Sequence, residues 1–239
     1  MKLTDFRVLT FDCYGTLIDW ESGIWAALQP LLHRAQPAPS RATVLEAFAR
    51  HENQQEADTP AMPYPELLAE VHRRLGRELG VDMPEQAHRR FGDSVPDWPA
   101  FPDSPAALAY LKQHYELVIL SNVDRASFAA SNRRLGVAFD AIYTAQDIGS
   151  YKPDLANFRY MLDHLAERGI RPGEILHTAQ SLFHDHVPAK AVGLASAWID
   201  RRHEQDGWGA TTPAPDARYE FRFTSMQEMA DAHRQALAA

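Results

Sequence analysis

The sequence predicts an α/β protein with a doubly wound parallel sheet as its core and an inserted helical module. Three features of the chain lead to this fold class. A short run of β-forming residues near the start gives way to a long stretch of helical character, and the second half alternates strand-like and helix-like segments. Such alternation is typical of βαβ units, whose strands form a parallel sheet.

The first predicted strand covers residues 7–11 (RVLTF), an apolar run rich in β-forming residues. It ends at the sequence DCYGT, where Gly15 interrupts the pattern. We interpret this run as a buried strand that enters a tight loop.

The helical module is predicted at residues 20–95, which are rich in Ala, Leu, Glu, Arg and Gln and should form about four helices. The clearest helix has apolar residues at i, i+3, i+4 and i+7 spacing, followed by Gly80 as a stop signal; these residues are Tyr64, Leu67, Leu68, Val71, Leu75 and Leu79. The proline-rich run 96–105 (PDWPAFPDSP) should return the chain to the core. The predicted division is therefore a core of residues 1–19 and 96–239 and a helical cap domain of residues 20–95.

The second half of the chain contains the remaining elements of the predicted sheet. Strands are expected at residues 116–120, 141–144, 175–179 and 195–199. Helices are expected at residues 105–113, 125–135 and 155–168, from 187 onward, and at 225–238, with a loop at 203–217.

The composition indicates a chain with enough hydrophobic residues for a full core. The 239-residue chain is 45% hydrophobic and has a formal net charge of -8 without a dense Lys/Arg run. This argues against a nucleic-acid partner and against binding to an anionic membrane. Cys13 is the single cysteine, which excludes an intrachain disulfide. No signal peptide or membrane-spanning stretch is recognisable, so a reducing cytoplasm is the expected compartment.

Polar side chains follow each predicted strand, at the edge where open parallel sheets collect their functional groups. Asp12 and Thr16 follow the first strand, and Ser121 and Asn122 follow the second. Lys152 lies beyond the third strand, and the run from Gln180 to Asp185 follows the fourth.

The ordered set FDCYGTL, LSN, YKPD and an Asp185 before a helix resembles the four motifs of the haloacid dehalogenase superfamily. The resemblance covers nearly the whole chain; its first motif is highly specific and its fourth is degenerate. It implies a Rossmann-like core with the helical insert as a type 1 cap. It also implies that Asp12 is a covalent nucleophile kept ionised by Lys152, and that Thr16 and Ser121 hydrogen-bond the nucleophile and the substrate.

Two departures from the phosphatases of this superfamily concern the leaving group and the metal. Those enzymes carry a second Asp two residues after the nucleophile as a general acid, and this chain has Tyr14 there. They bind Mg²⁺ through acidic residues of the fourth motif, where this chain has the neutral Gln180, a poorer ligand for a hard cation. Both departures favour the branch that resembles the L-2-haloacid dehalogenases, which have the pattern D-x-Y-G-T and use no metal or cofactor.

The resemblance implies that Asp12 displaces halide from C2 of a short 2-haloacid, and that Asp185 assists hydrolysis of the resulting ester. Arg50 is assigned as a catalytic residue because it matches an Arg of the family's cap and lies off the buried side of its predicted helix. The residues expected to bind the substrate or the departing halide are Cys13 and Tyr14 in the first loop, followed by Asn122, Ser181 and His184.

Two alternatives remain open. One is a Mg²⁺-dependent small-molecule phosphatase, against which Tyr14 and Gln180 weigh. The other is a non-catalytic binding protein, because the fourth motif is QSLFHD where dehalogenases have S-S-N-x-x-D. Relatives often dimerise, so a homodimer is compatible with the resemblance.

Overall fold

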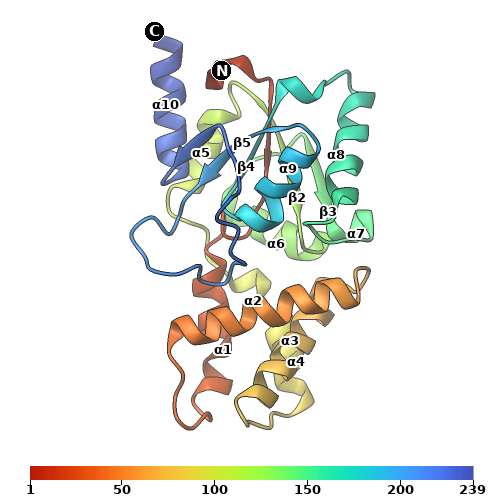
Figure 1. Ribbon diagram of the computed structural model, residues 1–239, viewed down its shortest axis with the longest axis vertical. Coiled ribbons are helices and arrows are strands. Elements are labelled where there is room, and N and C mark those ends of the chain that lie inside the picture. Colours follow the sequence, from red (N-terminus) through yellow and green to blue (C-terminus); the bar gives the residue numbers. More distant parts are fainter. Residues whose placement is uncertain (239) are drawn as a thin grey trace.

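The core of the protein is a six-stranded parallel sheet in the computed structural model, which describes residues 1–238 (Figure 1). The strands lie in the order β3-β2-β1-β4-β5-β6, and each neighbouring pair is parallel. Their bounds are β1 (Val8–Phe11), β2 (Glu116–Ser121), β3 (Ala141–Thr144), β4 (Ile175–Ala179), β5 (Ala195–Ile199) and β6 (Phe221–Phe223). The order reverses at β1, so the carboxyl ends of β1 and β4 flank the crevice where doubly wound sheets bind ligands.

Strand β1 lies in the middle of the sheet, and its residues are all buried. Alternate side chains of a strand point to opposite faces of the sheet. Leu9 and Phe11 belong to the larger hydrophobic cluster, whereas Val8 belongs to a second, smaller one. The sheet therefore has a core on each face, which explains why its strands are continuous apolar runs.

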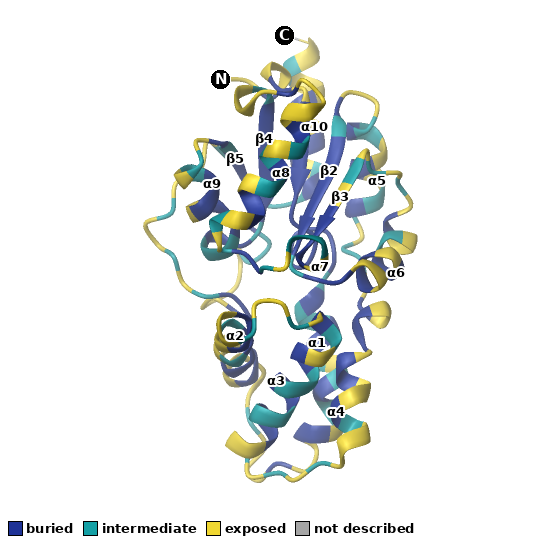
Figure 2. Cartoon of the chain, turned by 90° about the vertical axis from the view of Figure 1, so that its right-hand side faces the viewer, coloured by how far each residue is buried: buried dark blue, intermediate teal, exposed yellow. Residues whose placement is uncertain are grey.

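Helices cover both faces of the sheet, and their bounds are α5 (Ser104–Leu111), α6 (Arg125–Leu135), α7 (Ala145–Ile148), α8 (Leu155–Glu167), α9 (Val187–Ala191) and α10 (Met226–Ala238). Residues of α5, α6 and α10 pack in the larger cluster, and residues of α8 and α9 pack in the smaller one. Figure 2 shows the buried strands between helices whose outer sides are exposed.

The segment between β1 and α5 forms a separate helical layer, below the sheet in Figures 1 and 2. It consists of α1 (Trp20–Leu32), α2 (Arg41–Asp58), α3 (Tyr64–Glu78) and α4 (Glu85–Gly92). Asp19 and Ser40 cap α1 and α2 by accepting hydrogen bonds from the backbone N–H groups of Ser22 and Thr43. The carboxyl ends of the strands face this layer, so a site at the sheet edge lies between core and cap.

The α/β fold class predicted from the sequence is confirmed, while three local features were not expected. Strand β6 has only three residues and begins after a polar loop, so it carries too little pattern to be recognised. The short helix α7 directly follows β3, and a single π-helical turn, η4 (Leu182–His186), precedes α9. No helix in the described chain is both long and apolar enough to cross a membrane.

Candidate active site

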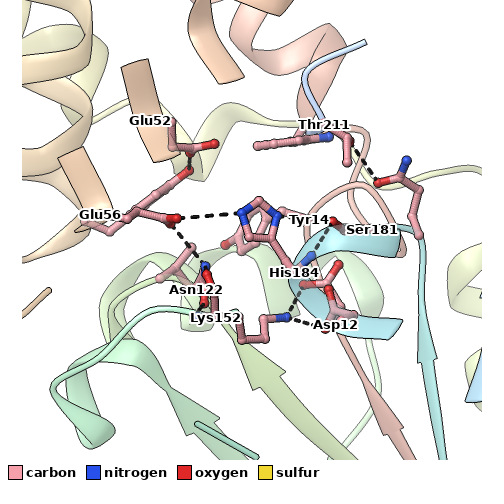
Figure 3. A pocket seen from close by; sticks show the side chains of 14 residues that line it. Asp12, Tyr14, Glu52, Glu56, Asn122, Lys152, Ser181, His184 and Thr211 are labelled. Atoms are coloured by element: carbon pink, nitrogen blue, oxygen red, sulfur yellow. Dashed lines mark hydrogen bonds and ion pairs between the residues drawn. The ribbon is translucent and has the colours of Figure 1, made fainter. Parts of the chain in front are cut away.

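A small cavity of about 40 Å³ lies at the carboxyl ends of β1 and β4, between the sheet and the cap (Figure 3). The core lines it with Asp12, Lys152 and Asp185, together with side chains from η4. The cap lines it with side chains from α1, α2 and α3. The cavity therefore brings together residues that are far apart in the sequence, at the position where this sheet topology predicts a site.

Asp12 is fixed by hydrogen bonds to both of its carboxylate oxygens. Thr16 Oγ1 donates to Oδ2 over 2.7 Å, and Lys152 Nζ donates to Oδ1 over 2.9 Å. The tight loop that follows requires a glycine, because Gly15 has φ +90° and an added Cβ would lie 3.0 Å from the side chains of Gln180 and Trp20. The local sequence DCYGT thus positions the carboxylate at the end of β1, as predicted.

Lys152 connects the two buried aspartates. Its ammonium donates to Asp12 Oδ1, to Asp185 Oδ1 over 2.7 Å, and to the carbonyl oxygen of Leu120 over 3.0 Å, and the residue is only 1% exposed. Burial favours the neutral amine, but the two carboxylates outweigh it and raise the pKa of Lys152 above its ordinary value. Lys152 therefore remains a cation throughout the physiological pH range.

The pKa values of the two aspartates shift in opposite directions. Burial raises the pKa of Asp12, and Lys152 only partly offsets it. Burial also acts to raise the pKa of Asp185, but Lys152 and His177 outweigh it and leave that pKa below its ordinary value. Asp185 is therefore the more strongly ionised of the pair.

His177 is a site residue that sequence reasoning missed. It is completely buried in β4, where its Nε2 lies 2.8 Å from Asp185 Oδ1 and its Nδ1 lies 2.8 Å from Thr10 Oγ1. The other oxygen of Asp185, Oδ2, has no hydrogen-bond partner among residues 1–238. The signal in the sequence was a histidine inside a predicted buried strand, since such a polar group needs partners.

Ser121 is the last residue of β2 and Asn122 follows it, and the structure gives the two side chains different surroundings. Asn122 lines the cavity; its Oδ1 accepts from the backbone N–H of Lys152 over 2.7 Å, and its Nδ2 donates to the carbonyl of Lys152 and to Glu56 Oε1. Ser121 is buried behind the lining, and its hydroxyl has no hydrogen-bond partner in the described part of the chain. Asn122 thus holds the loop that carries Lys152 in place.

His184 and Ser181 lie together in the cavity wall. His184 Nδ1 lies 3.1 Å from Ser181 Oγ, and its Nε2 lies 2.7 Å from Asn53 Oδ1 of the cap. Burial lowers the pKa of His184 to about 4. The ring is therefore neutral at pH 7, and its Nε2–H is directed to Asn53.

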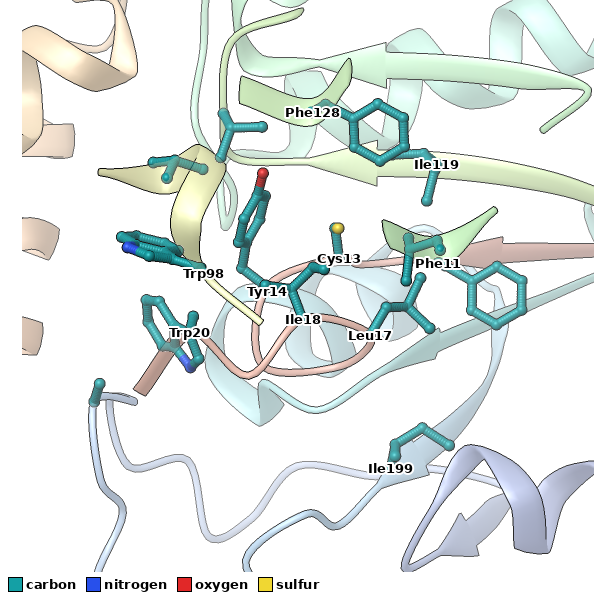
Figure 4. Close-up of a cluster of buried hydrophobic side chains, with 14 of the residues drawn as sticks. Phe11, Cys13, Tyr14, Leu17, Ile18, Trp20, Trp98, Ile119, Phe128 and Ile199 are labelled. Carbon is teal, nitrogen blue, oxygen red and sulfur yellow. The ribbon is translucent and has the colours of Figure 1, made fainter. Parts of the chain in front are cut away.

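Tyr14 and Cys13 are neighbours in the first loop, and both side chains are buried (Figure 4). Tyr14 lines the cavity, but its hydroxyl lies 2.8 Å from Ser131 Oγ and its ring packs edge-on against Trp98. Burial raises the pKa of Tyr14 well above 10. The Cys13 thiol is buried in the hydrophobic core, and burial also raises its pKa. Neither group is ionised at neutral pH.

The prediction that Arg50 faces the cleft is wrong. The Arg50 side chain is 59% exposed and pairs with Glu78 on the outside of the cap. At about 100° per residue, Arg50 and Glu52 differ by about 200° around the helix axis, so they point to nearly opposite sides. Glu52, which lines the cavity, therefore takes the direction that was expected of Arg50.

Glu52 and Glu56 are the second feature that sequence reasoning missed. They lie one helical turn apart on α2, are 4% and 6% exposed, and both line the cavity opposite Asp12. Burial raises the pKa of Glu52 to about 8, although Tyr64 donates a hydrogen bond to its Oε1 over 2.8 Å. The signal was present, because Leu45, Phe48 and Glu52 share the i, i+3, i+7 spacing of a buried helix face.

The comparisons with known proteins agree with this architecture. Residues 6–178 match the family model of the haloacid dehalogenase-like hydrolases. A defluorinating L-2-haloacid dehalogenase superimposes with a TM-score of 0.78 at 22% identity, covering 98% of each chain. The L-2-haloacid dehalogenase of Xanthobacter autotrophicus with chloropropionic acid covalently bound gives 0.76 at 17% identity, covering 96% of this chain and 98% of that one. No curated protein matches the sequence.

A third structural neighbour raises the question of a metal ion. The Bacillus subtilis hydrolase YfnB, in a structure bound to magnesium, has a TM-score of 0.72 at 19% identity and is covered over 97% of its length. In the present site, Lys152 already occupies one oxygen of Asp12 and one of Asp185. Among residues 1–238, no group of three or more His, Cys, Asp or Glu side chains is arranged to hold a metal. Mg²⁺ is usually bound through one or two carboxylates together with water, so at this site it would have to compete with the Lys152 ammonium for both aspartates.

Proposed function

The chain belongs to the haloacid dehalogenase-like hydrolases, and we propose that it is a hydrolase of the dehalogenase type, in which Asp12 displaces halide from a short substrate without a metal ion. The observation that carries this proposal is the pairing of Lys152 with both Asp12 and Asp185. The ammonium supplies a positive charge that favours the ionised form of the nucleophile and offsets part of the effect of burial on the pKa of Asp12. It also binds one oxygen of each aspartate, for which a divalent cation would have to compete.

In the first step, a carboxylate oxygen of Asp12 attacks the carbon that bears the halogen. A C–O bond forms, the carbon–halogen bond breaks, and the halide leaves with the bonding electron pair. This step needs no general acid, because halide leaves as a stable anion. The observed position of Tyr14 supports this choice, since its hydroxyl is directed to Ser131 and not to the cavity.

In the second step, water attacks the carboxyl carbon of the Asp12 ester and releases the alcohol product. Asp185 takes the proton from that water through Oδ2, which has no hydrogen-bond partner within the described residues and belongs to a carboxylate held beside Asp12 by Lys152. The proton then passes to the departing alkoxide, and Asp12 is regenerated. His177 and Lys152 hold the other oxygen of Asp185 and so orient the carboxylate.

The experiment that tests the proposal is a halide-release panel of chloroacetate, bromoacetate, fluoroacetate and both enantiomers of 2-chloropropionate, with 2-chloroethylammonium as a cationic member. Each compound is assayed with wild type, Asp12→Asn and Asp185→Asn, and a chromogenic phosphate ester is assayed with Mg²⁺ and with chelator. We expect Asp12-dependent halide release that the chelator does not reduce. Mg²⁺-dependent phosphate release that exceeds halide release would contradict the proposal.

A further inference from the structure

The cap places two carboxyl groups directly against the reaction site. Glu52 and Glu56 project from the inward face of α2 into the cavity that contains Asp12 (Figure 3). Both side chains are more than nine-tenths buried. Burying two acidic groups next to two aspartates costs folding free energy unless they have partners. Their position in the cavity therefore suggests a role in binding.

The partners of these two groups are incomplete. Glu52 accepts from Tyr64, and one oxygen of Glu56 accepts from Asn122 over 3.1 Å. The other oxygen, Glu56 Oε2, has no hydrogen-bond partner among the residues described. Its nearest basic group is His184 Nε2 at 3.8 Å, which is neutral at pH 7 and directed to Asn53. Glu56 Oε2 therefore has no hydrogen-bond donor within the described chain and is available to a donor group of a ligand.

The charges that line the cavity are strongly unbalanced. Of the described lining residues, Lys152 is the one with a permanent cationic side chain, and Asp12 and Asp185 already share its ammonium. A substrate carboxylate would bring a further negative charge into this space with no free cation to pair with it. The exposed Arg50, which would have supplied such a cation, is paired with Glu78 on the other side of the helix.

We propose that Glu52 and Glu56 are the substrate-recognition pair of this enzyme, and that they bind a cationic nitrogen, such as an ammonium group, on the compound that Asp12 attacks. The inference rests on the proposed displacement by Asp12 and adds its substrate class. A primary ammonium has three N–H donors, which match the free oxygen of Glu56 and the neighbouring carboxyl of Glu52. The pairing would give Glu56 Oε2 the partner that it lacks and form a buried salt bridge.

Binding of a cation should be linked to proton release. In the empty cavity, burial raises the pKa of Glu52 to about 8 and raises the pKa of Glu56 well above its ordinary value. A bound cation favours the ionised carboxylate, so affinity should rise with pH up to about 8. Most of the other titratable groups facing this pair keep their charge between pH 6 and pH 8; they are Tyr64, Tyr151, Lys152, His184 and Asp185. Asp12 also faces the pair, and burial raises its pKa.

The test uses propylammonium and propionate, two unreactive probes of similar size and opposite charge. Isothermal titration calorimetry at pH 8 should show that wild type binds propylammonium at least about tenfold more tightly than propionate, a difference of about 1.4 kcal/mol. Glu56→Gln and Glu52→Gln, which preserve shape and remove the charge, should each abolish most of this preference. Glu46→Gln is the matched control, because Glu46 is an exposed glutamate on the same helix and should leave binding unchanged.

The same titrations in two buffers with different protonation enthalpies should reveal proton release when propylammonium binds. Equal or tighter binding of propionate by wild type, or an unchanged preference in Glu56→Gln, would overturn the inference.

The recognition step and the displacement step fail in distinguishable ways. If propylammonium binds but neither 2-chloroethylammonium nor chloroacetate releases chloride above the uncatalysed rate, recognition stands and displacement by Asp12 is wrong. If chloroacetate is turned over in an Asp12-dependent manner and propylammonium does not bind, displacement stands and the recognition of a cation is wrong.

Discussion

At the scale of single residues, one buried ammonium determines the charge state of the site. Lys152 is the shared partner of Asp12 and Asp185, and all three groups are almost completely removed from water. A buried charge that loses its partner is strongly destabilising, whereas an exposed pair contributes little. The contrast predicts very different results for two lysine substitutions.

Replacing Lys152 by Met should lower the free energy of unfolding at pH 7 by about 3–5 kcal/mol and abolish halide release. The folded variant must protonate its buried aspartates, whereas Lys152 holds the pKa of Asp185 below its ordinary value in wild type. The stability gap should therefore narrow as pH falls toward 4, which urea unfolding at pH 4 to 8 can measure. Lys112→Met, which removes a partly exposed pair with Asp140, should cost less than about 1 kcal/mol. Equal effects of both substitutions would contradict this account.

Glu52 should make stability depend on pH in the opposite direction. Its pKa is about 8 in the folded protein and 4.5 as an unperturbed group. Between these values the unfolded chain is ionised while the folded protein stays neutral, so wild type loses stability as pH rises from 4.5 to 8. Glu52→Gln keeps an acceptor for Tyr64 and does not titrate, so its advantage over wild type in urea unfolding should grow across this window. A constant difference from pH 4.5 to 8 would show that Glu52 is ionised in the folded state.

At the scale of elements, the part of the site that the core contributes could be predicted from the sequence, whereas the part that α2 contributes could not. The tight loop after β1 carries Asp12 and Thr16 with a local sequence that specifies its geometry, and the structure brings Asp12, Asn122, Lys152 and Asp185 together as expected. The cap residues could not be assigned in the same way. Their orientation depends on how α2 is rotated about its axis relative to the core. The resemblance to the family pointed to Arg50, which lies on the side of α2 that faces away from the cavity.

The orientation of α2 predicts that Arg50→Ala leaves catalysis nearly unchanged. Arg50 is exposed and its ion pair with Glu78 lies outside the cavity. We expect kcat/KM for the best compound of the halide-release panel to change less than about twofold, and stability to change by less than about 1 kcal/mol. A loss of kcat/KM comparable to that of Asp12→Asn would mean that the cap presents its other side to the substrate.

Strand β4 shows a second limit of sequence-based reasoning. The run ILHTA predicts a buried strand, and the structure confirms it. The pattern alone does not reveal what His177 contacts, because its partners Thr10 and Asp185 come from β1 and from η4. The fourth motif shows the same limit. Gln180 and Leu182 depart from the family pattern, but the π-helical turn still brings Asp185 into contact with Lys152.

At the scale of the whole molecule, the site depends on contacts between cap and core. His184 of the core contacts Asn53 of α2, Asn122 contacts Glu56, and Tyr151 donates to the carbonyl of Met62. Asn53 also contacts Thr212, in the long loop between β5 and β6. The η4 turn and the loop between β5 and β6 thus both contact Asn53, which connects these two core segments to the cap.

Asn53→Ala should loosen this closure. The substitution leaves the buried Nε2–H of His184 without its acceptor, which should cost about 1–3 kcal/mol of stability. We expect KM to rise more than kcat falls, and amide hydrogen exchange to accelerate in residues 182–186 and 208–214. Gln54→Ala is the control, because Gln54 is exposed and bonds to Asp58 on its own helix. Unchanged exchange in both segments would contradict a role of Asn53 in closing the cavity.

The central claim is that Asp12 forms a covalent ester which water then hydrolyses at the carboxyl carbon. A single turnover in H₂¹⁸O, with enzyme in excess over the best compound of the halide-release panel, tests it most directly. If Asp12 forms the ester, the peptide containing Asp12 should gain one ¹⁸O atom while the alcohol product carries none. Incorporation of ¹⁸O into the product, with an unlabelled Asp12, would mean that water attacks the substrate directly and would contradict the account.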